Sequence, residues 1–323
     1  MASRTASYAE ALVDALYEGL ERDPRASLIG SYVLGLGPQR HLMDRIREAF
    51  PERVGDPPTA EAAIAATGVG AAMAGARPFV DLGTASFSYL AWSQIVNEAA
   101  VAHYMSGGGL TVPVTFHMLH GVRGAGAAQH SQSPQAMLWN APGLEIVAPS
   151  TPNDVGGLVR TAMQSANPTV IVSHAKLLGI EGPVEEVPIP FGVADCKRQG
   201  RDVTIVAYSL MVHEALKAAA ELAAEGIEVE VIDPRTQTPL DEAAILRSVE
   251  KTGRLVVVDE CPLRGSVASE IAATVAEKGF GLLKAPIRRV TRADTPVGYS
   301  PTLEAFVTPD AAKVARAVRE ILA

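Results

Sequence analysis

One carboxylate stands out because its surroundings are otherwise apolar. Glu61 begins a stretch, residues 61–76, that is rich in alanine and glycine and carries no other charge. Loss of water disfavours the charged form of a carboxyl group, so a carboxyl in such surroundings can share a proton at neutral pH. The alternative is a first-turn acid that only complements the helix dipole. The charge pattern alone favours this alternative.

A second candidate is His130, which follows a loop containing Gly121, Gly124 and Gly126. Such a loop can bring an imidazole to the mouth of a pocket, where it can donate or accept a proton. A lone loop histidine is more often structural, so the loop itself leaves both interpretations open. His117 and His120 have the spacing of a metal-binding pair, but no third ligand is suggested nearby.

The elements that must position these side chains follow a regular alternation. Ser7 and Glu10 fit a capping box at the start of a first helix. A helix is expected over residues 61–76 and another over residues 88–104, and Thr151 followed by Pro152 predicts a further helix start. Short apolar strands are predicted at residues 27–30, 78–81, 112–116, 144–147, 169–173, 203–207, 229–232 and 255–259. This alternation predicts an α/β fold with mainly parallel sheets flanked by helices.

The chain is long enough for two domains, with 323 residues. Prolines, glycines and acids interrupt the alternation after the fifth strand. We expect one domain at residues 1–183, a linker at residues 184–195 and a second domain at residues 196–323.

The composition excludes several classes of function. A balance of 28 basic and 36 acidic residues, net charge −8, argues against nucleic acid as the main partner. No uncharged apolar run reaches the roughly 18 residues of a membrane span. Two cysteines and the lack of a signal core lead us to expect a cytoplasmic protein. The sequence has no Walker loop and no nucleophile elbow, and Gly68 and Gly70 lie inside a helical pattern, where a dinucleotide fingerprint would not.

The stretch around Glu61, residues 59–78, resembles the pyrimidine-binding domain of thiamine-diphosphate enzymes. It most resembles the beta subunits of the decarboxylating component of 2-oxo acid (pyruvate or branched-chain) and acetoin dehydrogenase complexes. The resemblance covers nearly the whole chain, through the strings TASFS at 84–88, YMSGG at 104–108, AAQHS at 127–131, VIDPRTQTPLD at 231–241 and TPVGYSP at 295–301. It implies a transketolase-like pyrimidine domain followed by a transketolase C-terminal-like assembly domain.

The resemblance also implies roles for individual residues. The carboxyl of Glu61 would touch a ring nitrogen of the aminopyrimidine of thiamine diphosphate and favour the imino tautomer that deprotonates the thiazolium carbon. Phe87 would pack on the aminopyrimidine, and Leu90 would lie near the cofactor, where some members have glutamine. His130 would sit at the substrate channel and bind substrate or handle protons near the lipoyl acceptor.

Metals and partners follow in the same way. The Gly-Asp-Gly motif with its following Asn, which holds Mg2+ and the diphosphate, is absent from this sequence. The resemblance assigns that motif to an alpha subunit in an α2β2 heterotetramer. A monovalent-cation (K+) loop of some members corresponds to Val114, Ala162, Ser165 and Asn167, with Ser165 in place of an acid.

The resemblance implies decarboxylation of a 2-oxo acid, or cleavage of acetoin, with acyl transfer to lipoamide on a partner acyltransferase. Two alternatives remain open: a split transketolase or acyloin-forming carboligase that uses an aldehyde acceptor, and a non-catalytic scaffold subunit. The chain departs from the family near the expected pocket. Gly30-Ser31-Tyr32-Val33 replaces a common acidic pair, and His117 replaces a common arginine.

Overall fold

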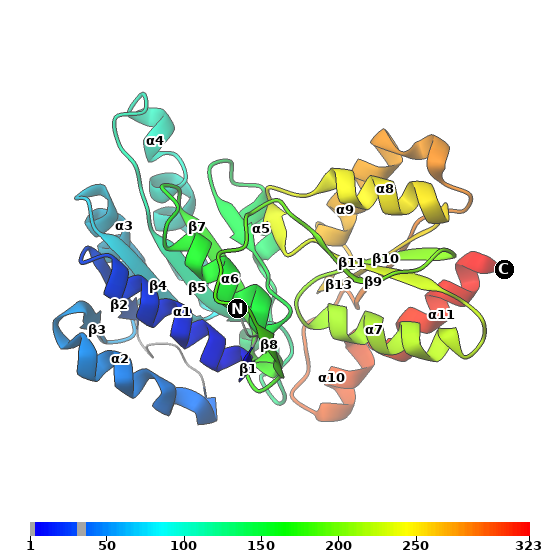
Figure 1. Ribbon diagram of the computed structural model, residues 1–323, viewed down its shortest axis with the longest axis horizontal. Coiled ribbons are helices and arrows are strands. Elements are labelled where there is room, and N and C mark those ends of the chain that lie inside the picture. The colour runs from blue at the N-terminus through cyan, green and yellow to red at the C-terminus, as the bar shows by residue number, and fades with distance from the viewer. Residues whose placement is uncertain (1–3, 31–36) are drawn as a thin grey trace. The chain divides into compact units, whose positions relative to one another are not determined.

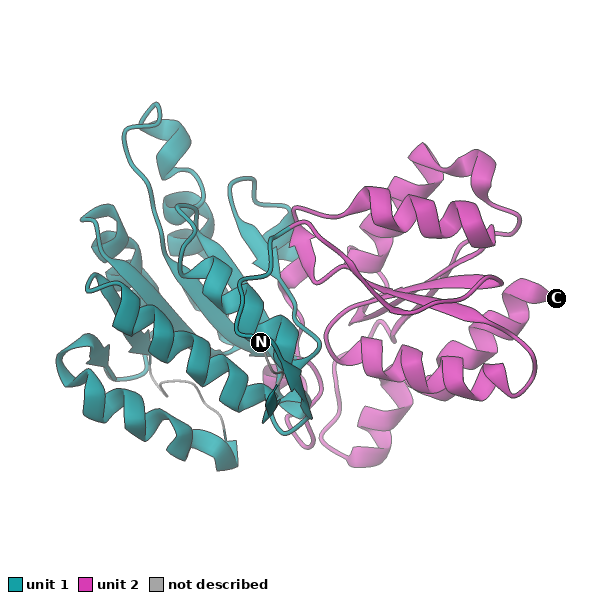
Figure 2. Ribbon diagram, in the orientation of Figure 1, with its two compact units in different colours: residues 1–120, 137–191 teal, residues 121–136, 192–323 magenta. Residues whose placement is uncertain are grey.

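The structure is a computed structural model that describes residues 4–30 and 37–323 (Figure 1). Contacts divide the chain into two compact units (Figure 2). Unit 1 comprises residues 1–120 and 137–191, and unit 2 comprises residues 121–136 and 192–323. The glycine-rich segment 121–136 therefore belongs to unit 2, although residues of unit 1 precede and follow it.

Unit 1 is built on parallel strands in the order β6-β7-β5-β4-β2-β3. The strands are β2 (Ala26–Gly30), β3 (Val54–Gly55), β4 (Arg77–Thr84), β5 (Thr115–His120), β6 (Glu145–Val147) and β7 (Thr169–His174). A separate antiparallel pair joins β1 (Arg4–Ser7) to β8 (Glu181–Val184). The helices are α1 (Tyr8–Arg22), α2 (Asp44–Ala49), α3 (Glu61–Met73), α4 (Ala102–Met105) and α6 (Pro152–Ala162), and α5 (Gln135–Trp139) begins in the segment assigned to unit 2.

Alternation along the strands separates the two faces of this sheet. Val170 and Val172 of β7 share a core cluster with Ile64 and Val69 of α3. Helices α1 and α6 pack against each other, away from that cluster (Figure 1). Helix α3 approaches β4 very closely, because a Cβ at Gly68 would lie 2.3 Å from Val80 Cγ2. Gly68 therefore serves close packing, whereas a Cβ at Gly70 would meet nothing within 4 Å.

Unit 2 contains a second sheet in the order β14-β13-β10-β11-β9, parallel except for the antiparallel β9. Its strands are β9 (Asp195–Arg198), β10 (Val203–Ala207), β11 (Val229–Asp233), β13 (Leu255–Pro262) and β14 (Arg288–Arg292), with a short β12 (Thr236–Thr238) outside this sheet. Its helices are α7 (Leu210–Ala223), α8 (Glu242–Thr252), α9 (Val267–Lys278), α10 (Pro301–Val307) and α11 (Ala311–Leu322). Figure 1 shows α7 and α11 on one face and α8 and α9 on the other. The α/β prediction is confirmed.

One predicted helix is wrong in detail. Residues 88–104 do not form a single α-helix but pass through a 3-10 helix η3 (Ala85–Ala91), a π-helix η4 (Gln94–Ala99) and the short α4. Buried residues still recur every fourth position at Ala91, Ile95 and Ala99. Because tight, regular and wide turns all bury such a stripe, the periodicity could not distinguish them. No helix in the described ranges is long and apolar enough to cross a membrane.

The capping box predicted at the start of α1 is present and generates a stability prediction. Glu10 N–H donates to Ser7 Oγ at 3.2 Å, and Ser7 N–H donates to the Glu10 carboxylate at 2.7 Å. We expect Ser7→Ala to lower the free energy of unfolding by about 0.5–2 kcal/mol in urea titrations, because one helix N–H loses its acceptor. Ser300 is the matched control, since it occupies the N-cap of α10 without a side-chain cap bond. Equal losses in Ser7→Ala and Ser300→Ala would contradict the capping assignment.

The stability that this capping box contributes depends on pH, because it involves the Glu10 carboxylate. The hydrogen bond from the Ser7 backbone, then that from its side chain, lowers the pKa of Glu10. A carboxyl with a lowered folded-state pKa stabilises the fold above its unfolded pKa, and that contribution is lost as pH falls through the folded value.

Candidate functional site

Glu61 is the first residue of α3 and is only 7% exposed. Ala60 at the N-cap offers no side-chain cap. Within residues 4–30 and 37–323, nothing donates a hydrogen bond to the Glu61 carboxylate or pairs with its charge. The helix amides and dipole favour a negative charge there, but a buried carboxylate without a specific partner is costly. This side chain is therefore suited to receive a hydrogen bond from a bound molecule.

Phe87 and Leu90 lie on η3, which directly follows the carboxyl end of β4 and packs against α3. Phe87 is half-buried, whereas Leu90 is 62% exposed. In a parallel α/β sheet, ligands bind at the carboxyl ends of the strands. The structure thus brings the elements that carry Glu61, Phe87 and Leu90 together at one edge of unit 1.

A buried polar chain runs across three neighbouring strands of unit 1. His117 Nδ1 lies 3.3 Å from Asp81 Oδ1, and His117 Nε2 lies 3.1 Å from Ser173 Oγ. The Tyr8 hydroxyl donates to the same Ser173 Oγ at 2.9 Å. Histidine takes the place of an expected arginine here, and it is held by an aspartate in the facing register position.

Asp81, His117 and Ser173 are linked in the same order as the residues of a nucleophilic triad. These three side chains are nevertheless part of the buried core of unit 1. His117 is 1% exposed and Ser173 is fully buried, so no substrate carbonyl reaches the hydroxyl. Nor do the described residues contain a cluster of three histidines, cysteines or acids that could hold a metal ion. The replaced acidic pair at Ser31-Tyr32-Val33 lies outside the described residues.

His130 ends the short 3-10 helix η5 (Ala128–His130) and is exposed. Arg123 Nη2 lies 3.2 Å from His130 Nδ1. A guanidinium can only donate, so Nδ1 is the acceptor and the neutral ring carries its proton on Nε2. The backbone of this loop is strained, with positive φ at Ala125 and Ala127, and such strain is concentrated at functional sites.

The segment that carries His130 is fastened to the rest of unit 2 by side chains far away in sequence. Each contact joins one of these side chains to a backbone group of the segment: Arg292 Nη1 to the Ser131 carbonyl (2.6 Å), Val122 N–H to Glu260 Oε1 (2.5 Å), Gly126 N–H to Glu304 Oε1 (3.3 Å) and Cys261 Sγ to the Ser133 carbonyl (3.2 Å). These residues were missed in the sequence. They lie on three different elements, β13, β14 and α10, so no local pattern in the sequence marked them.

The oxygens of the expected cation loop take part in hydrogen bonds within unit 1. Its oxygens already accept hydrogen bonds from the protein: the Val114 carbonyl from Thr169 N–H (2.9 Å), the Ala162 carbonyl from Ser165 N–H (3.1 Å) and the Ser165 carbonyl from Arg77 Nη1 (2.7 Å). The Ser165 hydroxyl and the Asn167 amide both donate to Glu145, at 2.7 and 3.0 Å. Hydrogen bonds from Ser165, Asn167 and the Arg77 guanidinium thus hold this loop in place.

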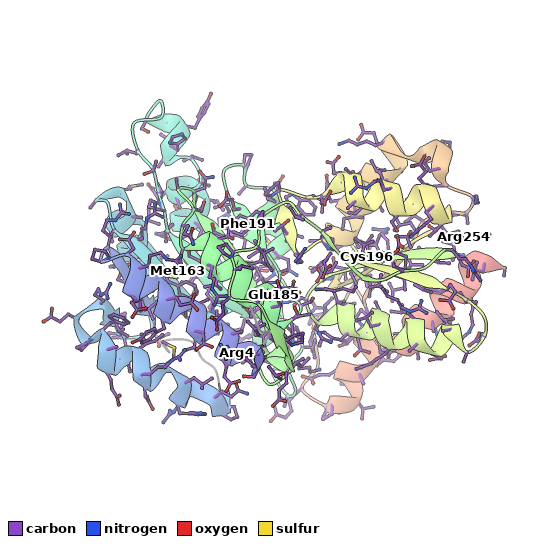
Figure 3. The ribbon with its side chains drawn as sticks, in the orientation of Figure 1. Arg4, Met163, Glu185, Phe191, Cys196 and Arg254 are labelled. Atoms are coloured by element: carbon purple, nitrogen blue, oxygen red, sulfur yellow. The ribbon has the colours of Figure 1, made fainter. Side chains whose placement is uncertain are left out.

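The two cysteines do not supply a nucleophile. Both Cys196 (labelled in Figure 3) and Cys261 are free thiols. Burial raises the pKa of Cys196 and raises that of Cys261 well above its usual range. Since the thiolate is the reactive form, neither thiol is activated.

Comparisons with known proteins assign both halves of the chain. Residues 4–180 match the family described as "Transketolase, pyrimidine binding domain", and residues 192–314 match "Transketolase, C-terminal domain". The beta subunit of acetoin:2,6-dichlorophenolindophenol oxidoreductase from Cupriavidus necator is 41% identical, over 99% of this chain and 98% of its own.

Two further relatives have similar coverage. The 2-oxoisovalerate dehydrogenase subunit beta of Bacillus subtilis is 40% identical over 98% of each chain. The pyruvate dehydrogenase E1 component subunit beta of Rickettsia conorii is 41% identical over 97% of each. A solved "Split gene transketolase, inactive beta4 tetramer" superposes with a TM-score of 0.81 over 98% of each chain at 24% identity, which shows a shared fold.

Proposed function

Because the chain belongs to the family of transketolase-like beta subunits of 2-oxo acid and acetoin dehydrogenases, we propose that it supplies the pyrimidine half of a thiamine-diphosphate site. The observation that carries this proposal is the buried Glu61 carboxylate at the start of α3, without a partner among the described residues. We further propose domain boundaries at residues 183 and 196, which the matches to residues 4–180 and 192–314 support.

Each residue of unit 1 has a distinct task in this proposal. Glu61 holds a proton at a ring nitrogen of the cofactor's aminopyrimidine, Phe87 packs on that ring, and Leu90 contributes apolar contact beside it. When bound, the cofactor supplies a nucleophilic thiazolium carbon for addition to a keto group. The protein's contribution is to position the ring and to hold the proton. Mg2+ and the diphosphate are assigned to the alpha subunit, and a K+ ion at residues 114, 162, 165 and 167 stays a prediction.

His130 acts on substrate in this proposal. Its ring carries the proton on Nε2, because Arg123 occupies Nδ1 as a donor. An exposed imidazole whose Nε2 carries the proton can donate a hydrogen bond to a substrate oxygen. The fastening of the loop by Arg292 and Glu260 keeps this nitrogen in place.

The proposed partner is an alpha subunit, in an α2β2 assembly. Apolar side chains exposed on unit 1 support such a partner, since Tyr104 is 89% and Met105 77% exposed on the string that resembles the family. The proposed substrate is a 2-oxo acid or acetoin, and the acceptor is lipoamide on an acyltransferase. We also propose a cytoplasmic location, supported by two free cysteines.

Product analysis on the chain assembled with its alpha subunit tests the reaction. Acyl-lipoamide formed from a 2-oxo acid or acetoin, and only with a lipoylated acceptor, is the expected result. Transfer of the fragment to an aldehyde with no use of lipoamide would instead identify a carboligase. The absence of turnover with either acceptor would identify a scaffold.

The proposed role of Glu61 predicts that one step, removal of the thiazolium proton, becomes slower when the carboxyl is replaced. In the assembled protein, Glu61→Gln should slow deuterium exchange of the thiazolium proton by about 100- to 10,000-fold, because the amide cannot hold the proton at the ring nitrogen. Glu242 is the matched control, since it is a first-turn glutamate of α8 in unit 2, and Glu242→Gln should exchange at the normal rate. An unchanged exchange rate in Glu61→Gln would contradict this role and would show that Glu61 only complements the dipole of α3.

The role of His130 predicts a loss at a different stage. We expect His130→Ala to keep normal cofactor affinity and normal thiazolium proton exchange, while turnover falls by about 10- to 1,000-fold through loss of one positioned donor. Single-turnover measurements should locate the loss after the cofactor is activated. Unfolding of His130→Ala, or failure to assemble, would show that the histidine is structural.

A further inference from the structure

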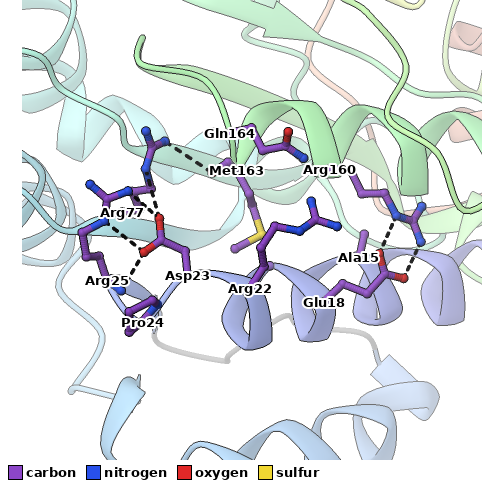
Figure 4. Close-up of a pocket in the computed structure, with 11 residues that line it drawn as sticks. Ala15, Glu18, Arg22, Asp23, Pro24, Arg25, Arg77, Arg160, Met163 and Gln164 are labelled. Carbon is purple, nitrogen blue, oxygen red and sulfur yellow. Dashed lines mark hydrogen bonds and ion pairs between the residues drawn. The ribbon is translucent and has the colours of Figure 1, made fainter.

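A pocket of unit 1 lies between the carboxyl-terminal turns of α1 and α6 and takes no part in the site described above (Figure 4). Its volume is about 480 Å³, and small-molecule sites commonly span about 300–1,000 Å³. Its lining includes four guanidinium groups and two carboxylates, from Arg22, Arg25, Arg77, Arg160, Glu18 and Asp23. Positive charge is therefore in excess here, in a chain whose net charge is −8.

Three of the four arginines are held in fixed positions. Arg160 makes two bonds to Glu18, at 2.7 and 2.6 Å, and its side chain is 2% exposed. Arg25 donates twice to Asp23, at 3.0 and 2.7 Å, and Arg77 Nε lies 3.4 Å from the same carboxylate. The Arg25 bonds lower the pKa of Asp23 to about 2, so this carboxylate stays ionised and keeps both arginines oriented.

Arg77 also removes an obstacle to anion binding. Carbonyl groups at the end of a helix repel anions. The Nη1 of Arg77 donates to the Met163 and Ser165 carbonyls beyond α6, at 3.4 and 2.7 Å. Two carbonyl groups beyond the negative end of α6 are thus already bound by a guanidinium.

Arg22 differs from the other three arginines of the lining because its guanidinium is not bound to a carboxylate or a carbonyl of the described residues. It lies in the last turn of α1, is exposed, and makes no hydrogen bond or ion pair with any part of the chain that the structure describes. Figure 4 shows its side chain extending from α1 toward α6. The two carboxylates of the lining are already bound to other arginines, so the charge of Arg22 is uncompensated.

We propose that this pocket binds the phosphate group of a small phosphorylated molecule. A phosphate monoester carries about −1.5 to −2 charge at neutral pH, which matches the excess of two guanidinium groups over the carboxylates. Arginine forks bind phosphate oxygens in pairs. The pocket exceeds the volume of a phosphate group, and Ala15, Pro24 and Met163 give an attached apolar moiety a surface to contact.

Calorimetry on the protein assembled with its alpha subunit tests this site. The assembly is first saturated with thiamine diphosphate and Mg2+, so that the cofactor site is filled, and chloride keeps the ionic strength constant. Phenyl phosphate should bind to the beta chain with a dissociation constant of about 1 mM or below, and more tightly than inorganic phosphate. Arg22→Gln should weaken binding by about 10- to 100-fold, the value of a charge-assisted hydrogen bond, and Arg22→Lys should retain part of it.

Arg247 provides the matched control, because it is an exposed arginine of α8 with no hydrogen bond or ion pair to the described residues. Arg247→Gln should bind phenyl phosphate as the parent does. The proposal is overturned if Arg22→Gln binds as tightly as Arg247→Gln, or if neither anion binds the parent assembly below 10 mM, a limit of roughly −2.7 kcal/mol. Since the cofactor site is filled throughout, neither result depends on the proposed reaction.

Discussion

The candidate site in unit 1 depends on one carboxylate that the packing around it keeps largely out of water. Glu61 is buried at the start of α3, and no described side chain compensates its charge. Burial of a lone charge is unfavourable, so the surrounding packing must impose it. That packing is dense: α3 approaches β4 so closely that Gly68 has no room for a Cβ. Helix α3 thereby places the carboxylate at the carboxyl edge of the sheet, beside η3.

The second candidate group is held by a different part of the chain. His130 lies on a segment between two stretches of unit 1, yet that segment is bonded to the side chains of Glu260, Arg292 and Glu304 in unit 2. Each of these is a buried charged residue. Side chains of the C-terminal unit therefore hold the segment that presents the loop histidine. A division of the chain by sequence order alone would not reveal this.

Much of the fold follows from sequence, and the reasons are local. The capping box of α1, the Thr151 cap before Pro152 and the strand at residues 203–207 were all predicted, because caps and apolar runs act over a few residues. The π-helix at residues 94–99 was not predicted, because its burial pattern imitates a regular helix. Short elements without an apolar stripe, such as β9, were missed.

The site was predictable only as far as the resemblance reached. Glu61, Phe87 and His130 lie in strings that resemble the family, and their types suit their expected roles. The Asp81–His117–Ser173 chain and the arginine-lined pocket required coordinates, because their members come from separate elements whose pairing no local pattern specifies.

The central claim is that this chain holds one half of a cofactor site and needs an alpha subunit for the other half. Calorimetric titration of thiamine diphosphate with Mg2+ into the purified chain, and then into the chain assembled with its alpha subunit, tests this directly. We expect tight binding, with a dissociation constant of about 1–10 μM, only in the assembly. Low-micromolar, Mg2+-dependent binding by the chain alone would contradict the account.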